Sequence, residues 1–309
     1  MDVSYDIDDG LPAWRCRPGR TLPGGMLAVR RLRVGAHCES WLAWSVEQWC
    51  PVEVKVIRPH QLRQPRALRS LTREVTALAD ATHPTLPRLL HDGTHDELPH
   101  LLLEHVDGPS LADALDETGP MAPEDAAVLC AQLLACVADL HRRGLAHLDM
   151  RPANVVLRDG SPVVVDFGST RRIGTSQPVG RPIGTPGYAA PEQELCMPIC
   201  STMDCYAVGV ILYEAVTGDT PGQSSELVSV PPELRRVVHG LLAPDPDRRM
   251  TAASAMRAVA ETIPADRRPW PRWADRHLRL HATAIRLEAL PIAKSSSFEI
   301  ERVQQTSTG

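Results

Sequence analysis

The stretch HLDMRPAN, residues 147–154, indicates the fold of this chain when it is taken together with DFG, residues 166–168. Two apolar runs, 154–157 and 162–165, lie between them and flank RDGS at 158–161, a pattern that predicts a β-hairpin. Asp149 and Asp166 therefore lie close to the two ends of one hairpin. Taken alone, each aspartate would be an ordinary turn residue, so the interpretation depends on what surrounds them.

Upstream of the hairpin the sequence alternates short apolar runs with one helical pattern. We predict strands at residues 27–29, 41–44, 52–57, 88–90 and 100–105. Apolar residues at helical spacing predict a helix over 67–81, which His83-Pro84 ends. The strand at 52–57 contains Lys55 and the helix contains Glu74. This part of the chain is therefore expected to form a small α+β unit.

Downstream of residue 106 the sequence is mainly helical. The apolar spacing predicts helices over 123–143, 204–217, 232–242 and 252–263. Residues 204–217 are apolar nearly all round, so we expect a buried central helix that ends at Gly218. Between the hairpin and that helix lies GTPGYAAPE, residues 184–192.

These elements in this order resemble the signature set of protein kinases. The matching features are Lys55, Glu74, HLD with Asn154, DFG and the Ala190-Pro191-Glu192 triplet. The resemblance covers about residues 22–263 and is to the bacterial, actinobacterial-type, eukaryotic-like serine/threonine kinases. It implies an α+β, two-lobed fold with a β-rich N-lobe and a larger helical C-lobe. The expected boundaries are a flexible or loosely packed leader at 1–24, the N-lobe at 25–106, the C-lobe at 107–263 and a partly helical, then disordered tail at 264–309.

The resemblance also assigns catalytic and metal-binding roles, which the chemistry of phosphoryl transfer explains. Cations must neutralise the charge on the transferring phosphoryl group, and the acceptor hydroxyl must be aimed at it. Lys55 is expected to contact the ATP phosphates and to pair with Glu74. Asp166 and Asn154 would hold Mg²⁺, which prefers oxygen ligands. Asp149 would take or orient the acceptor's proton, and Arg151 replaces the family's usual lysine.

Further positions follow from the same resemblance. Residues 102–106 resemble the hinge, with Leu103 as gatekeeper and the backbones of Glu104 and Val106 reading adenine. The expected ATP contacts are completed by Leu32, Gly35 and Val156. In the activation segment and below it, the resemblance implies structural roles for Thr185, Glu192, Asp204 and Arg249. The GTPGYAAPE segment favours serine or threonine acceptors over tyrosine.

The residues expected to cover bound ATP, here called the nucleotide roof, depart from the family pattern. Of the three glycine places only Gly35 keeps its glycine, while Arg33 and Cys38 occupy the other two. Glycine there lets backbone N–H groups approach phosphates closely. Ser40 and Glu53 replace apolar roof residues. A carboxylate buried against a purine would cost several kcal/mol if unpaired, so Glu53 must swing out, find a cation, or weaken ATP binding.

The catalytic loop departs as well, because Leu148 stands where many kinases have an arginine that pairs with an activation-loop phosphate. A phosphate on the activation loop therefore lacks one of the cations that would bind it in those kinases. We therefore expect activity to depend little on activation-loop phosphorylation.

Composition excludes several other classes of protein. The formal net charge is −5, which argues against a general nucleic-acid binder. No run of 18 apolar residues predicts a membrane span. None of the eight cysteines forms a C-x-x-C pair, which favours reduced thiols in the cytoplasm over a zinc site. An N-terminus without a basic-then-apolar start argues against a secretory signal.

Three functions are open from the sequence, and the segment at residues 184–192 argues against one of them, a small-molecule phosphotransferase on a related fold. Two functions remain. The first is an active kinase that uses ATP and Mg²⁺ to phosphorylate protein hydroxyls, its own included. The second is a pseudokinase, a regulatory or scaffold module that keeps the fold with weak or no turnover. The protein substrate is not legible. The Arg- and Trp-containing tail after residue 263 is either a packing segment or a docking segment for a regulatory partner.

Overall fold

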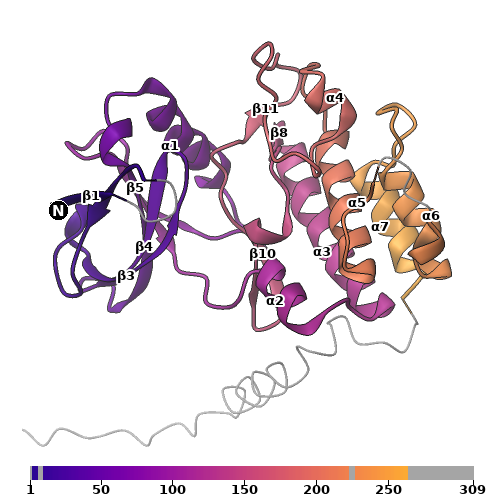
Figure 1. Ribbon diagram of the computed structural model, residues 1–309, viewed down its shortest axis with the longest axis horizontal. Coiled ribbons are helices and arrows are strands. Elements are labelled where there is room, and N and C mark those ends of the chain that lie inside the picture. The colour runs from indigo at the N-terminus through magenta and orange to yellow at the C-terminus, as the bar shows by residue number, and fades with distance from the viewer. Residues whose placement is uncertain (1, 6–9, 223–226, 264–309) are drawn as a thin grey trace, which may run out of the picture.

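The computed structural model describes residues 2–5, 10–222 and 227–263, which form two lobes (Figure 1). The first lobe is built around a sheet and the second is mainly helical, as the sequence predicts. The proposed tail at 264–309 lies outside the described residues. Within the described part of the chain, no helix is both long and apolar enough to cross a bilayer.

The first lobe consists of one antiparallel sheet of five strands and one long helix, α1. The strand order is β3-β4-β5-β7-β6. The strands are β3 (Leu27–Val34), β4 (Cys38–Ser45), β5 (Cys50–Ile57), β6 (Leu89–Gly93) and β7 (His100–Glu104), and α1 spans Pro65–Leu78. Central β5 is buried from Val52 onward and carries Lys55 directly opposite Ser40 of β4.

The segment before β3 packs against the sheet, which differs from the loosely packed leader expected at 1–24. β1 (Asp2–Tyr5) pairs with β2 (Pro12–Arg15). The backbone N–H of Trp14 donates to Glu39 Oε1 at 2.8 Å, and its indole N–H donates to the carbonyl of Ile57 at 2.7 Å. Fully buried Arg58 donates to the carbonyl of Pro12 at 3.4 Å. Single anchoring residues of this kind leave no periodic signal in a sequence.

The second lobe contains the remaining helices and two small strand pairs. The helices are α2 (Leu111–Thr118), α3 (Pro123–Arg142), α4 (Pro191–Glu194), α5 (Thr202–Thr217), α6 (Pro232–Leu241) and α7 (Ala252–Ala260). β9 (Val155–Arg158) pairs with β10 (Ser161–Val164), and β8 (Leu145–Ala146) pairs with β11 (Arg171–Arg172).

Local chemistry explains where these helices begin and end. α3 starts at Pro123 with Glu124 and Asp125 in its first turn, which suits the positive end of the helix dipole. α5 ends at Gly218, whose φ of 83° is left-handed. Sequence periodicity missed α2, because eight residues give too few turns to read. Its start is marked by a capping box between Ser110 and Asp113.

One apolar core joins the two lobes and positions the site. It includes Leu71 of α1 and Leu101 of β7 from the first lobe, and most of the inward faces of α3 and α5 from the second. Phe167 lies in this core with no exposed surface and meets the ring of His147 edge-on at 4.9 Å between centroids. The catalytic-loop and DFG stretches are thus packed together where α1 meets the helical lobe.

Candidate active site

Three charged groups from distant parts of the chain meet between the lobes. Lys55 Nζ of β5 lies 2.6 Å from Glu74 Oε2 of α1 and 2.8 Å from Asp166 Oδ1. Lys55 and Glu74 are buried, whereas the Asp166 side chain keeps 44% of its surface exposed. The Asp166 carboxylate therefore faces the space between the lobes while its Oδ1 is held by the lysine.

The electrostatics of this triad keep Lys55 charged. Burial would lower its pKa, but the carboxylates of Asp166 and Glu74 outweigh that effect and raise the pKa above the usual lysine value. The Lys55 ammonium in turn holds the pKa of Asp166 far below its ordinary range, against the effect of burial. At neutral pH the site therefore presents a deprotonated Asp166 carboxylate to any ligand in the cleft.

The catalytic-loop stretch brings Asp149 and Asn154 together. Asn154 Nδ2 donates to the backbone carbonyl of Asp149 at 2.9 Å and to its Oδ2 at 3.3 Å. Thr185 Oγ1, from the segment before α4, donates to Asp149 Oδ1 at 2.7 Å. Both carboxylate oxygens of Asp149 are thus held by hydrogen bonds, which fixes the orientation of the carboxylate.

Asp204, at the start of α5, holds the loop from below. Its carboxylate accepts the backbone N–H of His147 at 2.9 Å and that of Leu148 at 2.8 Å, and it lies 2.9 Å from His141 Nε2. Burial alone would raise the Asp204 pKa, but its hydrogen bonds, beginning with that of His141, lower it. These contacts sustain a left-handed φ of 68° at Leu148, a conformation that non-glycine residues rarely adopt.

Leu148 is buried in an apolar cluster, where many kinases have an arginine. Its neighbours in this cluster include Ala190, Ile199 and Met203, and its own exposure is 3%. Gln193 Nε2 donates to the Leu148 carbonyl at 2.8 Å and also reaches the carbonyl of Ile183. The catalytic loop and the activation segment are therefore joined here by apolar packing and an amide side chain.

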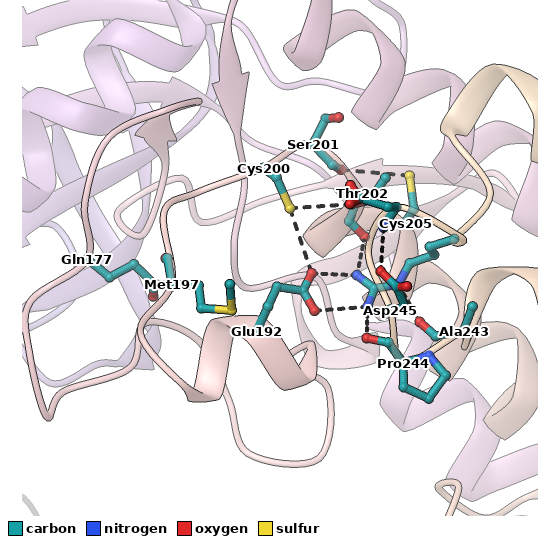
Figure 2. A network of polar contacts seen from close by, with 12 residues as sticks. Gln177, Glu192, Met197, Cys200, Ser201, Thr202, Cys205, Ala243, Pro244 and Asp245 are labelled. Carbon is teal, nitrogen blue, oxygen red and sulfur yellow. Dashed lines mark hydrogen bonds and ion pairs between the residues drawn. The ribbon is translucent and has the colours of Figure 1, made fainter.

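The activation segment ends at a buried ion pair between Glu192 and Arg249. Arg249 Nη1 and Nη2 lie 2.5 Å and 2.9 Å from the two carboxylate oxygens of Glu192. Around Glu192, Figure 2 shows Cys200, whose Sγ lies 3.7 Å from Oε1, together with Thr202 and Pro244. The Thr202 and Pro244 carbonyls accept from Arg249 at 3.0 Å and 3.1 Å. This bidentate, fully hydrogen-bonded geometry makes the pair a structural one.

A polar cavity of about 450 Å³ lies over Asp149, Asn154 and Asp166. Lys55 and Arg151 line it, as do Gly35 of the turn between β3 and β4 and Cys38, the first residue of β4. At Gly35 a side chain would meet the Cys38 carbonyl at 3.3 Å, and buried Arg58 donates to the Gly35 carbonyl at 3.2 Å. A cavity lined by cations above two aspartates and an asparagine suits a polyphosphate with its metal ions.

A second, much smaller cavity lies toward the chain's hinge, with a volume of about 10 Å³. Leu103, Val165 and Lys55 line it together with Arg33 and Glu53. Arg33 Nη2 lies 4.0 Å from Glu53 Oε1, so Glu53 finds a cation, one of the three outcomes its sequence position allows. Arg33 lines both cavities and therefore stands between them.

The remaining positions expected to contact ATP are placed as follows. The Glu104 side chain pairs with Arg158, and its backbone N–H donates to the carbonyl of Arg88 at 2.9 Å. Val106 and Val156 belong to one small apolar cluster that also contains Val163 and Val165. Leu32 is half-buried in β3, and its contact with ATP stays a prediction.

The donor set fits a hard divalent cation. The amide nitrogen of Asn154 donates hydrogen bonds to Asp149, so the amide oxygen Oδ1 is the atom that can bind a cation. Asp166 Oδ1 contacts Lys55, so Oδ2 is the atom available to a cation. Because the pKa of Asp166 is depressed, no proton competes with the cation for Oδ2. An amide oxygen and a carboxylate oxygen, with phosphate oxygens and water, match the ligands that Mg²⁺ prefers.

Sequence reasoning missed a group of arginines that line the cavity of about 450 Å³. Arg73 of α1 and Arg171 of β11 both line it. Burial and the neighbouring charges of Arg73 and Arg69 lower the pKa of Arg171 to about 10. Arg171 Nη1 donates to the carbonyls of Ser169 and Thr170 at 2.7 Å and 2.9 Å. Only the fold brings α1 beside the residues after DFG, so no local pattern could have revealed this group.

Comparison with known proteins agrees with this geometry. The protein kinase domain family matches residues 30–259. The chain is 34% identical over 237 residues to serine/threonine-protein kinase PkaA of Streptomyces coelicolor, covering 69% of this chain and 44% of that protein. It is 32% identical over 254 residues to serine/threonine-protein kinase PknB of Mycobacterium leprae, covering 74% and 41%.

A third relative is the probable serine/threonine-protein kinase PkwA of Thermomonospora curvata. The identity is 30% over 274 residues, which covers 84% of this chain and 36% of the relative. The matches thus span less than half the length of each of these three relatives. The order of the site residues, the two lobes and the match over residues 30–259 lead to one conclusion: the chain belongs to the protein kinase domain family.

Proposed function

We propose that this chain is an ATP-dependent serine/threonine protein kinase that transfers the γ-phosphate of ATP to protein hydroxyl groups, including its own. The observation that carries the proposal is the Lys55–Glu74–Asp166 triad, with contacts of 2.6 Å and 2.8 Å, in which Lys55 and Asp166 line the same cavity as Asp149 and Asn154. Positioned charges of this kind supply most of the catalysis in phosphoryl transfer.

In this proposal the chain's own residues have three tasks. Lys55 holds phosphate oxygens with an ammonium that Glu74 fixes in place. Asp166 and Asn154 hold Mg²⁺, which neutralises charge on the phosphates when bound. Arg151 lines the same cavity and adds a cation on the side of Asp149. Together they keep the transferring group in line with the acceptor.

The acceptor hydroxyl is placed by Asp149. Its carboxylate is fixed by Thr185 and Asn154, so it is oriented to accept a hydrogen bond from an incoming hydroxyl and to receive its proton as the phosphoryl group transfers. Printed names of the relatives specify serine/threonine kinases, which supports the same acceptor class here.

The pseudokinase alternative rests on one observation, the Arg33–Glu53 pair at the hinge-side cavity of about 10 Å³. A purine ring needs more room than this cavity provides. Binding of ATP therefore requires the pair to move, and a pair that does not move would leave a kinase fold without turnover.

The test is phosphate transfer by the full chain. The protein is incubated with Mg²⁺ and γ-labelled ATP, with and without dephosphorylated casein as acceptor, and the label is assigned to serine, threonine or tyrosine. Asp149→Asn removes the carboxylate while conserving its shape, and Asp219→Asn is the matched control on an exposed aspartate after α5. Label on the wild type and on D219N, but not on D149N, is the expected result. Absence of label on the wild type would overturn the proposal, and ATP-dependent thermal stabilisation without label would favour the pseudokinase.

A cytoplasmic location is part of the same proposal. All eight cysteines are free thiols, four of them buried (Cys38, Cys130, Cys136 and Cys205), which suits a reducing compartment.

A further inference from the structure

A groove of about 540 Å³ lies on the helical lobe, away from the residues proposed for catalysis. It runs between α2, the start of α3 and the turn that joins β9 to β10, elements that lie together in Figure 1. Apolar residues form its floor. Leu111 and Leu157 are buried, and Leu115 and Met121 are half-buried.

The groove has an acidic edge. Asp107, Glu117 and Asp159 line it and are exposed, and no lysine, arginine or histidine is among the described residues that line it. The surrounding sequence strengthens this charge, because residues 107–138 contain six acidic residues and no lysine or arginine. An apolar floor with an acidic edge fits a segment that carries apolar side chains among basic ones.

Residues 264–290 of the same chain have that composition. They contain six arginines against three acidic residues, together with Trp270, Trp273 and several leucines. The positive excess of this segment complements residues 107–138, which carry acidic residues and no lysine or arginine. No other stretch of the sequence combines two tryptophans with such an arginine excess.

The chain length makes this contact easy to reach. The described C-lobe ends at Ile263, which packs against the core shared by α3 and α7. α3 begins beside the groove and, at 20 residues, is roughly 30 Å long. Ten extended residues span about 33 Å, so residues from about 273 onward can reach the groove. Tethering at such short range gives an effective concentration on the order of millimolar, which populates even a weak contact.

We propose that the groove between α2 and the β9–β10 turn is a docking site for residues 264–290 of this chain, which bind by apolar contact with Leu115 and Met121 and by arginine contact with Asp107, Glu117 and Asp159. The contact is independent of phosphate transfer, so it stands or falls separately from the proposed kinase activity.

The test is photo-crosslinking of the full chain. Ala114 lines the groove and is half-exposed, so p-benzoylphenylalanine at this position reports what occupies the groove. The expected product joins residue 114 to a peptide within 264–290 of the same molecule. The same probe at Ala79, an exposed alanine after α1, is the control and should give no such product. Raising the salt from 0.1 M to 1 M should lower the yield several-fold, because the attraction is between exposed charges.

Charge reversal provides the second arm. The triple variant D107K/E117K/D159K should reduce the crosslink at least fivefold and speed amide hydrogen exchange within 264–290. The matched variant E47K/E97K/E233K changes the net charge equally at exposed positions elsewhere and should leave both unchanged. Exchange is measured on chains without the bulky probe, so a probe that blocks the groove does not decide the outcome.

Three results would overturn the proposal. One is the absence of any tail crosslink at Ala114 together with unchanged hydrogen exchange within 264–290 in D107K/E117K/D159K. Another is equal loss of the crosslink in the two triple variants. The third is a crosslink that forms between differently isotope-labelled molecules, which would assign the groove to a second copy.

Discussion

Glu53 gives the sharpest prediction, because its carboxylate lies where ATP's base is expected to enter. It is 8% exposed, and its Oε1 is 4.0 Å from Arg33 Nη2. At an effective dielectric constant near 20, two charges at this separation attract by about 4 kcal/mol. The Arg33 side chain is 42% exposed, so solvent screening reduces the net value to about 1 kcal/mol.

Separating the pair to admit the base therefore costs about 1 kcal/mol, which corresponds to roughly fivefold in affinity. Glu53→Ala removes that cost and removes the carboxylate from the purine's path. We expect the KM for ATP to fall about fivefold, while kcat stays the same because Lys55, Asp149 and Asp166 are untouched.

The assay is initial-rate kinetics of phosphate transfer over a range of ATP concentrations, with Glu97→Ala as the exposed, matched control. Arg33→Ala is the informative opposite, because it leaves a buried Glu53 carboxylate without its cation and should lower the melting temperature. If Glu53→Ala left the KM unchanged or raised it, the pair would not obstruct the base, and the reasoning would be refuted.

Three other predictions follow from the same contacts. Leu148 packs in an apolar cluster and offers no cation to a phosphate on the activation loop. Replacing four hydroxyl residues of that loop by alanine should therefore leave the phosphate-transfer rate within a few-fold of wild type (Ser169, Thr170, Thr175 and Ser176). A collapse in rate would contradict this. Arg249→Leu leaves Glu192 buried and unpaired, so chemical denaturation should show a loss of about 3–5 kcal/mol, and a loss below 1 kcal/mol would argue against a structural pair. Burial raises the pKa of the Cys38 thiol to about 12, so little thiolate is present at pH 8. Alkylation followed by mass spectrometry should therefore label Cys38 more slowly than half-exposed Cys16, and the labelling rate of Cys38 should rise with pH. Fast labelling of Cys38 at pH 8 would show that the thiol is not buried.

Local periodicity predicted a small α+β unit and most helices of the remainder, and the resemblance to protein kinases implied that these form two lobes. The helix expected over 67–81 is observed at Pro65–Leu78, and that expected over 204–217 at Thr202–Thr217. Errors of a few residues arise at the ends, where caps decide the boundary. The strand expected at 41–44 is twice as long, because Cys38–Ser40 and Ser45 pair in the sheet without an apolar signal of their own.

The candidate site was predictable where the family order fixes it and unpredictable where contacts cross the fold. The pairing of Lys55 with Glu74 followed from the resemblance, and the structure adds the contact between Lys55 and Asp166. The partner of Glu53 could not be named, because Arg33 reaches it across β4 from β3. The environment of Leu148 was equally hidden, since its neighbours Ala190, Ile199 and Met203 lie more than 40 residues away.

The segment at residues 10–16 has a practical consequence for where the folding unit begins. The family match starts at residue 30, yet Trp14 supplies a backbone donor to the buried carboxylate of Glu39, and Arg58 is capped by the Pro12 carbonyl. A fragment trimmed to the family boundary would leave an acid and a guanidinium without these partners, at the end of the strand that carries Lys55. The shortest fragment that folds like the whole chain should therefore start at or before Leu11.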